Sequence, residues 1–514
     1  MSAATVHALV EDAAAAVPDA VYATSADAAS APLRFGALAA DCRAIGAALD
    51  AAGVGRGDTV STVMGNGLAT MRVLLGAMHA GRRVNPVNLL SGEEQMRHVI
   101  GHADARLVVA APEWEERVRA VVAALEAPVR VVVVGVDAGV DEIVAAIAPS
   151  ARPTPASRET EAPRPDDTAL LMYTSGTTGL PKGVMLSHAN LAANARAISG
   201  EHGLGAADRV LGVLPLYHIN AFVVTMLSPL AHRGSVAMAP RFSAQQFWTQ
   251  ACVQRCTWIN VVPTIVSYLL EGEAPRRESL AAIRFCRSAS AALAPEHHRA
   301  FEAKFGIGIV ETMGLTETAA PSFSNPIDPA RRKVGSVGRA SGGEARIVDA
   351  SFAPVADGGT GEILIRGPHV MRGYYKNEAA TRDAFTADGW MRTGDLGHRD
   401  ADGFFFVTGR LKELIIKGGE NIAPREIDEA LLRHPAVLEA AATGMPDPHY
   451  GQEILACVVL REGHAASEEE LRAHCIALVG RYKAPKRVRF VASLPRGPSG
   501  KVQRLRLRDD EPPR

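Results

Sequence analysis

Helix-like and strand-like segments alternate along the first 150 residues, and this alternation constrains the fold more than any other feature of the chain. Residues 35–54 and 68–81 place apolar side chains at helical spacing and stop at glycines. The runs ARLVVAA (105–111) and VRVVVVG (129–135) are continuously apolar, which is typical of strands buried on both faces of a parallel sheet. We therefore predict an α/β fold in which helices cross over between parallel strands.

The same texture resumes after a proline-rich, polar stretch at residues 149–167, which is typical of a surface linker. Short strands with turns follow at 361–410, and a charged stretch then leads into a smaller set of helices and strands. With 514 residues the chain is too long for one simple core. We predict two domains, residues 1–409 and 410–514: a large lobe of sheets flanked by helices, and a small α+β domain.

Composition excludes several classes of protein. Lys and Arg number 55 against 56 Asp and Glu, which argues against nucleic acid as a partner. No stretch reaches the roughly 20 apolar residues that span a bilayer, and the N-terminal segment lacks a signal-peptide pattern, so we expect no membrane partner and a cytoplasmic protein. Six scattered cysteines predict buried free thiols, because the Cys252/Cys256 pair has no second ligand pair. A homo-oligomer is left open.

The segment YTSGTTGLPKG (173–183) lies between an expected strand and an expected helix, and it is rich in hydrogen-bond donors. The hydroxyls are those of Tyr173, Thr174, Ser175, Thr177 and Thr178, and the glycines that leave N–H groups accessible are Gly176, Gly179 and Gly183. Such a loop suits phosphate oxygens, and Lys182 adds a positive charge. It is not a P-loop, because Pro181 precedes Lys182 and Gly183 follows it.

This loop resembles the phosphate loop of the acyl-adenylate-forming (AMP-binding) family of acyl-CoA synthetases, luciferases and peptide-synthetase adenylation domains. Further motifs of that family follow in order: ETMGLTE (311–317), MRTGDLG (391–397), GRLKELIIKGGENI (409–422) and PRGPSGKVQR (495–504). The chain is therefore identified as a member over nearly its whole length. The resemblance implies a mobile C-terminal domain and ligation of an acid to coenzyme A through an acyl-AMP made from ATP.

The resemblance also implies which residues hold the nucleotide. Residues 174–183 would bind the β- and γ-phosphates, Thr316 the α-phosphate, and Glu317 a Mg²⁺ ion. Asp395 would accept the ribose hydroxyls beside Arg410. Met313 stands where relatives often carry a Tyr that stacks on adenine, and its sulfur can pack on a ring face.

For the second half-reaction, the resemblance implies that the small domain turns about Lys412. Gly418 and Gly419 would line the path of the pantetheine arm. Lys501, read alone, is a solvated terminal charge, but in the family the matching Lys bridges the acid and the α-phosphate.

The acid pocket is expected between residues 214–222, 287–295 and 311–322. The stretches 247–265, 283–295 and 324–338 most resemble the oxalate–CoA ligase branch. His218 and Ser288 or Ser290 match positions that hold the distal carboxylate there, although His218 could equally be a core or tunnel-lining residue. Ala320 replaces a further His, which argues against oxalate itself. We predict a short anionic acid, sulfonated (sulfoacetate-like) or dicarboxylic (oxalate-like).

Other interpretations stay open at this point. The acid could be neutral or aromatic, the acceptor could be a separate carrier protein, and the fold could serve a non-catalytic binding protein. The counter-charge for a second anionic group could come from Arg233, Arg241 or Arg287, which the sequence does not place.

Lys501→Ala tests the role of the C-terminal lysine. The variant should lose acyl-adenylate formation by about 10²–10³-fold, because charge on the carboxylate and α-phosphate is no longer neutralised. It should retain thioester formation from supplied acyl-AMP. The two half-reactions are measured separately, and equal loss of both would contradict the assignment.

Overall fold

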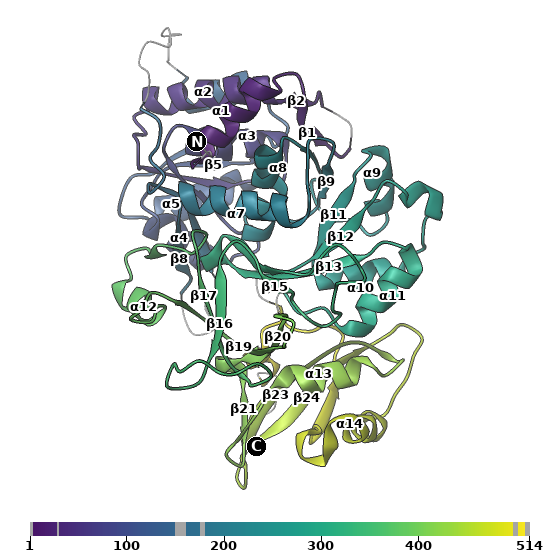
Figure 1. The fold of residues 1–514 in the computed structure, drawn as a ribbon. Coiled ribbons are helices and arrows are strands. Elements are labelled where there is room, and N and C mark those ends of the chain that lie inside the picture. Colours follow the sequence, from purple (N-terminus) through teal and green to yellow (C-terminus); the bar gives the residue numbers. More distant parts are fainter. Residues whose placement is uncertain (1–3, 28–29, 150–160, 175–179, 497–501, 509–514) are drawn as a thin grey trace.

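The computed structural model describes residues 4–27, 30–149, 161–174, 180–496 and 502–508. Figure 1 shows a large lobe, coloured purple to teal, above a smaller yellow-green domain. A sheet of intermediate residues lies between them. This mixed α/β arrangement confirms the predicted fold class.

One large sheet begins with the alternating segments of the N-terminal third. In spatial order its described strands are β18 (Gly373–Tyr374), β8 (Lys182–Ser187), β7 (Thr168–Thr174), β4 (Arg83–Pro86), β3 (Thr59–Val63), β5 (Ala105–Ala110) and β6 (Arg130–Val133). The strands from β7 to β6 run parallel, as predicted, whereas β8 is antiparallel to β7 and β18 is antiparallel to β8.

The expected course of the phosphate loop was wrong in one respect. We expected a helix after residues 173–183, but the chain first forms β8, which pairs antiparallel with β7. Helix α7 (His188–Glu201) begins only after Ser187, whose side chain caps it by accepting from Asn190 N. The loop is therefore the tip of a hairpin.

A second large sheet carries the segments expected to form the acid pocket. Its described strands, in spatial order, are β15 (Arg339–Ala340), β14 (Ala320–Ser324), β13 (Ile309–Leu315), β12 (Phe285–Ser288), β11 (Trp258–Val261), β9 (Arg209–Gly212), β10 (Ser235–Met238), β1 (Val21–Ser25) and β2 (Leu33–Arg34). Strands β9, β11, β12 and β13 are adjacent and parallel, so their carboxyl ends share one edge. Side chains that follow these strands are brought together there.

Helices cover both large sheets. The remaining helices of the large lobe are α1 (Val6–Ala16), α2 (Phe35–Ala51), α3 (Leu68–His79), α4 (Glu93–His102), α5 (Glu115–Ala123), α6 (Val140–Ile147), α8 (Ser228–His232), α9 (Phe247–Val253), α10 (Pro263–Glu271), α11 (Pro295–Phe305) and α12 (Glu378–Asp383). One continuous apolar core joins the two sheets through α1, α2, α3 and α7, while α4 and α5 cover the other face of the first sheet. Burial of this apolar area is the main stabilising term.

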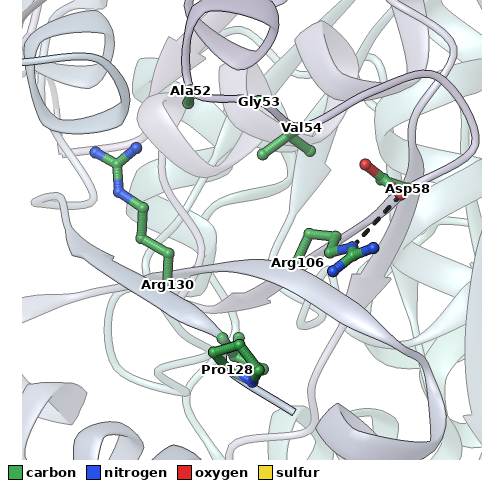
Figure 2. A pocket seen from close by; sticks show the side chains of 8 residues that line it. Ala52, Gly53, Val54, Asp58, Arg106, Pro128 and Arg130 are labelled. Atoms are coloured by element: carbon green, nitrogen blue, oxygen red, sulfur yellow. Dashed lines mark ion pairs between the residues drawn. The ribbon is translucent and has the colours of Figure 1, made fainter.

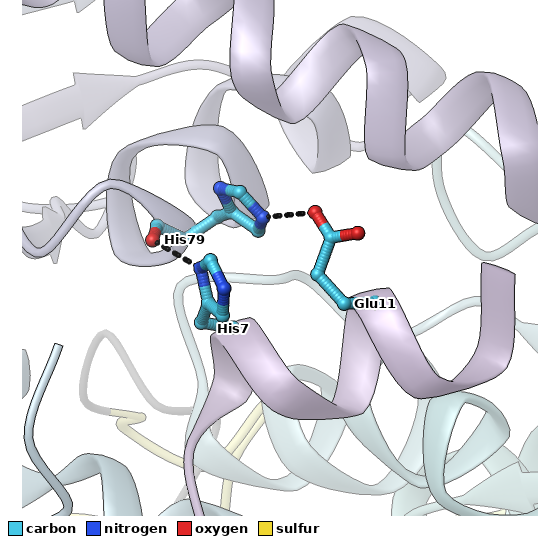
Figure 3. A group of neighbouring side chains, drawn as sticks. All are labelled: His7, Glu11 and His79. Atoms are coloured by element: carbon cyan, nitrogen blue, oxygen red, sulfur yellow. Dashed lines mark hydrogen bonds and ion pairs between the residues drawn. The ribbon is translucent and has the colours of Figure 1, made fainter. Parts of the chain in front are cut away.

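Helix α1 is fastened to α3 by polar contacts, which Figure 3 shows. His7 Nδ1 donates to the carbonyl of His79, and His79 Nε2 donates to Glu11 Oε1 (3.0 and 2.7 Å). Burial lowers the pKa of His79 to about 4, so its ring is neutral. Glu11 also pairs with Arg43 at 2.8 Å. Because these residues already hydrogen-bond or pair with one another and with Arg43, we interpret the cluster as a link between helices rather than a metal site.

One smaller sheet lies between the lobe and the C-terminal domain, and two others belong to that domain. They comprise β16 (Glu344–Val348), β17 (Gly361–Arg366), β19 (Met391–Arg399) and β20 (Phe405–Arg410), then β21 (Ile415–Lys417) with β22 (Glu420–Ile422), and β23 (Val437–Asp447), β24 (Gly451–Leu460) and β25 (Arg487–Phe490). Helices α13 (Pro424–Leu432) and α14 (Glu468–Lys483) complete the small domain, which has its own apolar core. The boundary at residues 409/410 stays a prediction.

All six cysteines are free thiols, as predicted, and Cys252 alone among them is half-buried rather than buried. Within the described ranges, no helix combines the length and apolar character needed to span a membrane.

The pairing of β13 with β14 depends on Gly314. A side chain at this residue would place its Cβ 1.9 Å from the carbonyl oxygen of Ala320, a backbone atom that cannot turn aside. Gly314→Ala should therefore lower the free energy of unfolding by about 1–3 kcal/mol. Thermal or denaturant unfolding measures the change.

Gly200→Ala is the matched control. Gly200 lies near the end of α7, and a Cβ there would meet nothing within 4 Å. This variant should be neutral or more stable by up to about 1 kcal/mol, because Ala has the higher helix propensity. Equal effects of the two substitutions would contradict the steric argument.

Candidate active site

The described ends of the phosphate loop are held by the hairpin of β7 and β8. Thr174 and Lys182 are direct partners across the two strands, so both lie at the base of the loop. Ser175, Gly176, Thr177, Thr178 and Gly179 lie outside the described residues. Gly183 lies within β8, where a Cβ would be 3.0 Å from the ring of Tyr173. Its missing side chain therefore makes room for that ring.

Tyr374 joins Lys182 to Glu317, which are 135 residues apart in the sequence. The Lys182 ammonium lies over the Tyr374 ring, 4.8 Å from its centroid. The Tyr374 hydroxyl donates to Glu317 Oε1 at 2.9 Å. Burial and the charge of Glu317 raise the pKa of Tyr374 well above its usual range, so the group stays a donor. The sequence analysis did not find Tyr374, because its partners are distant along the chain.

Thr316 and Glu317 form a short helical turn, η4 (Thr316–Thr318), directly after the carboxyl end of β13. Met371 N donates to the carbonyl of Glu317 at 2.7 Å, which fixes the turn against the segment leading to β18. Among described residues, Glu317 Oε2 has no hydrogen-bond donor. One carboxylate oxygen thus suits a hard cation such as Mg²⁺, which takes few protein ligands beside phosphates.

Asp395 and Arg410 form an ion pair at the junction of the domains. They are direct partners on β19 and β20, and Arg410 Nε lies 2.6 Å from Asp395 Oδ1. The carboxylate is buried, with its side chain 4% exposed. The charge of Asp395 is the main cause that raises the pKa of Arg410. The predicted ribose-binding pair is therefore brought together.

Met313 lies on β13, opposite Phe323 of β14, and packs against the apolar cluster that includes Phe323 and Phe405. Its side chain is half-buried, so one face remains accessible. Contact with an adenine ring stays a prediction.

The predicted hinge residue Lys412 is exposed in a single turn, η5 (Leu411–Glu413). Lys501 lies outside the described residues, but Arg504 of the same motif is placed. Arg504 pairs with Glu413 at 3.1 Å and with Asp428 of α13 at 2.6 Å. The end of the C-terminal motif is thereby tied to the hinge.

Gly418 and Gly419 form the turn between β21 and β22, with φ values of 56° and 86°. This left-handed pair is typical of a tight hairpin. A Cβ at Gly418 would lie 2.9 Å from the Tyr482 hydroxyl, so only glycine fits. Tyr450 and Tyr482 flank the turn and are 47% and 38% exposed, which leaves an aromatic surface beside it.

The expected acid-binding segments meet at the shared carboxyl edge of β9, β11, β12 and β13. Asn220, two residues after His218, donates from Nδ2 to Ser290 Oγ at 3.2 Å. Ser290 has a φ of 75°, a left-handed conformation that is strained for a serine. Ser288 is fully buried, and its hydroxyl has no hydrogen-bond partner among the described residues. His218 is half-buried.

The three candidate arginines differ in how far they are exposed to solvent. Arg233 and Arg241 are exposed, whereas Arg287 on β12 is 1% exposed. Sequence alone gave no means to separate them.

A surface hollow of about 530 Å³ lies elsewhere, at the amino ends of β3, β5 and β6 (Figure 2). Asp58 and Arg106 of its lining form an exposed ion pair at 3.8 Å. None of the predicted site residues lines it, so it has no part in the candidate site.

The sequence matches known families on both sides of Lys412, the predicted hinge residue. Residues 10–375 match the AMP-binding enzyme family, and residues 426–501 match the AMP-binding enzyme C-terminal domain. The chain belongs to the AMP-binding enzyme family. The large N-terminal and smaller C-terminal domains are those of this family.

Known proteins with similar sequences and structures support the assignment to this family. The sulfoacetate–CoA ligase of Cupriavidus necator is 57% identical over 503 residues, 98% of this chain and 97% of its own length. The oxalate–CoA ligase of Arabidopsis thaliana is 36% identical over 88% of each chain. The structure of ATP-bound MatB from Rhodopseudomonas palustris superposes with a TM-score of 0.89, at 30% identity and over 98% of both chains.

Glu311, which begins the ETMGLTE motif, is a buried acid with an unusual environment. Burial raises the pKa of Glu311 to about 7, and the charge of Arg425 on α13 offsets this only in part. Leu293 N donates to Oε1 at 3.3 Å, while Oε2 has no partner among described residues.

Glu311→Gln should therefore change the pH dependence of stability. The ordinary pKa is 4.5, so the neutral folded form stabilises below pH 4.5, and this contribution is lost as pH rises through about 7. At pH 8 the variant should unfold at a higher temperature than wild type, by a stabilisation of up to about 3 kcal/mol. Near pH 4.5 the two should coincide.

Glu302→Gln is a control with the opposite sign. Hydrogen bonds from His298 and Ile309 N, with the charge of Arg332, lower the pKa of Glu302 despite its partial burial. Its stabilisation is present above the ordinary pKa, so this variant should be less stable than wild type at pH 8. A stabilising effect of both substitutions at pH 8 would contradict the assignment for Glu311.

Proposed function

We propose that this protein is an AMP-forming acid–CoA ligase that acts on a short anionic acid, with sulfoacetate as the leading substrate. The observation that carries the proposal is 57% identity to a sulfoacetate–CoA ligase over nearly the whole of both chains. The more distant oxalate–CoA ligase also acts on a short acid with a second charge. The site offers a ribose acceptor, phosphate donors and a carboxylate for a cation.

In the first half-reaction, a carboxylate oxygen of the acid attacks the α-phosphorus of ATP. The bond to the β-phosphate breaks, pyrophosphate leaves, and acyl-AMP remains. Asp395 accepts the ribose hydroxyls, while Lys182 and Thr174 at the base of the loop hold the β- and γ-phosphates. Thr316 contacts the α-phosphate, and Lys501 neutralises both reacting groups. Catalysis of this kind is mainly positioning and charge stabilisation.

Glu317 is the residue proposed to hold Mg²⁺. When bound, the ion neutralises charge on the phosphates. The Tyr374 hydroxyl, at 2.9 Å, directs one oxygen of Glu317 and leaves the other for the cation. The Lys182 ammonium over the same ring keeps the phosphate charge and the carboxylate from repelling each other.

In the second half-reaction, the coenzyme A sulfur attacks the acyl carbon, the bond to the phosphate oxygen breaks, and AMP leaves. The thiol proton passes to solvent. Lys412 is the proposed pivot, and Gly418 with Gly419 lines the pantetheine path beside Tyr450 and Tyr482. The acid is held near His218, Ser288 and Ser290. A cytoplasmic location and a homo-oligomer stay predictions.

An acid panel tests the proposed function. AMP release is measured with free coenzyme A and each of sulfoacetate, malonate, oxalate, propionate and benzoate. We expect kcat/KM for sulfoacetate to exceed that for propionate by at least about tenfold, equivalent to about 1.4 kcal/mol of preferential binding. A preference for a neutral acid, or turnover that needs a carrier protein, would contradict the proposal.

Two Asp→Asn variants control for the active site. Asp395→Asn leaves one acceptor oxygen where the carboxylate has two and leaves Arg410 without its ion-pair partner, so KM for ATP should rise at least about tenfold. Asp357→Asn breaks a 2.7 Å ion pair with Arg399, which lies on β19, the strand that carries Asp395. Both side chains of this pair are 43% exposed. Surface pairs contribute little, so this variant should keep the wild-type KM.

A further inference from the structure

Arg287 is a buried cation without an acidic partner. Its residue surface is 1% exposed, and no Asp or Glu among the described residues lies within ion-pair distance of it. Its Nε also has no hydrogen-bond partner within the described ranges. Burying an unpaired charge costs several kcal/mol, so proteins rarely keep one without a use.

Two amides hold the guanidinium in place. Arg287 Nη1 donates to Asn220 Oδ1 and to Asn260 Oδ1, each at 2.8 Å. Asn260 is the direct partner of Arg287 across β11 and β12. Because a guanidinium has no acceptor, both amide oxygens must turn towards it. The Nδ2 group of Asn220 must then point away from the arginine.

The orientation of the Asn220 amide determines how Ser290 can hydrogen-bond. Asn220 Nδ2 donates to Ser290 Oγ at 3.2 Å, so the hydroxyl oxygen is used as an acceptor and its hydrogen remains for donation. The left-handed φ of Ser290, 75°, holds the residue in this strained position. The buried Ser288 hydroxyl, without a partner among described residues, lies on the same strand end.

We propose that Arg287, acting through Asn220 and Ser290, selects acids whose distal group is an anionic hydrogen-bond acceptor such as a sulfonate. This inference rests on the proposed function and names a positioning residue that determines its specificity. A sulfonate has oxygens that accept hydrogen bonds and none that donate. It therefore matches a site where the Ser290 hydroxyl can donate and the positive charge of Arg287 lies behind it.

Neighbouring groups do not supply the missing charge. Burial and the charge of Arg287 lower the pKa of His202 to about 3, so that ring is neutral. Burial raises the pKa of the Cys286 thiol well above its usual range, so it is also neutral. Burial lowers the pKa of Arg287 to about 9, which leaves it protonated at neutral pH. The cation therefore remains uncompensated until an anion binds.

The test compares two acids of similar shape, sulfoacetate and methylsulfonylacetate, whose distal groups are charged and neutral. Arg287→Gln should raise KM for sulfoacetate at least about tenfold and KM for methylsulfonylacetate less than about threefold, with kcat changed little. Arg287→Lys, which keeps the charge, should retain more of the discrimination than Arg287→Gln. Equal loss with both acids would mean a structural role and overturn the inference.

Two further variants test the inference even if the Arg287→Gln protein does not fold. Ser290→Ala removes only the final hydroxyl and should raise KM for sulfoacetate selectively. Arg233→Gln alters an exposed arginine from the same set of candidates and should leave the ratio of the two KM values unchanged. Loss of discrimination in Arg233→Gln, or its retention in Ser290→Ala, would overturn the inference.

The outcomes separate the two proposals. Wild-type enzyme that is inactive with sulfoacetate but active with another acid of the panel contradicts the proposed substrate, and with it this inference. Wild-type enzyme that prefers sulfoacetate, together with variants that keep the preference, contradicts only the role of Arg287.

Discussion

The ion pair between Asp395 and Arg410 lies where the large lobe passes into the small domain, and the geometry of the site depends on it. A buried carboxylate needs a partner, and the antiparallel register of β19 and β20 supplies one directly opposite. Arg410 is also the last residue before the turn that contains Lys412. The pair proposed to bind the ribose and the proposed hinge residue are therefore parts of one local structure.

From this hinge the polar contacts continue into the small domain. Glu413 pairs with Arg504, which pairs with Asp428, and all three belong to the C-terminal side of the hinge. Contacts across the two domains include an exposed ion pair, in which Arg433 lies 3.3 Å from Glu296, and a more buried hydrogen bond, in which Arg425 Nη1 donates to the carbonyl of Val407 at 2.6 Å. An exposed pair contributes only about 0–1 kcal/mol. The proposed rotation of the small domain about Lys412 would have to break both contacts, and the exposed pair adds little to that cost.

The sequence predicted the fold class because continuous apolar runs and helical periodicity depend on local burial alone. It predicted the site motifs because the family's order of segments was intact. It did not predict β8, because KGVMLS is only six residues long and its pairing with β7 depends on tertiary contacts. It also missed Tyr374, and it could not separate Arg287 from Arg233. Those assignments depend on burial and on partners that lie tens of residues away.

Arg287 is buried behind the side-chain amides of Asn220 and Asn260, and this position affects the selectivity proposed for the acid site. The guanidinium keeps two hydrogen bonds to Asn220 and Asn260, so the folded enzyme tolerates it. A neutral acid would displace water from the pocket yet leave the buried charge uncompensated, which carries a free-energy cost. An anionic acid gains attraction through a medium of low dielectric constant. Discrimination between anionic and neutral acids then comes from a penalty on the neutral acid as well as from attraction of the anionic one.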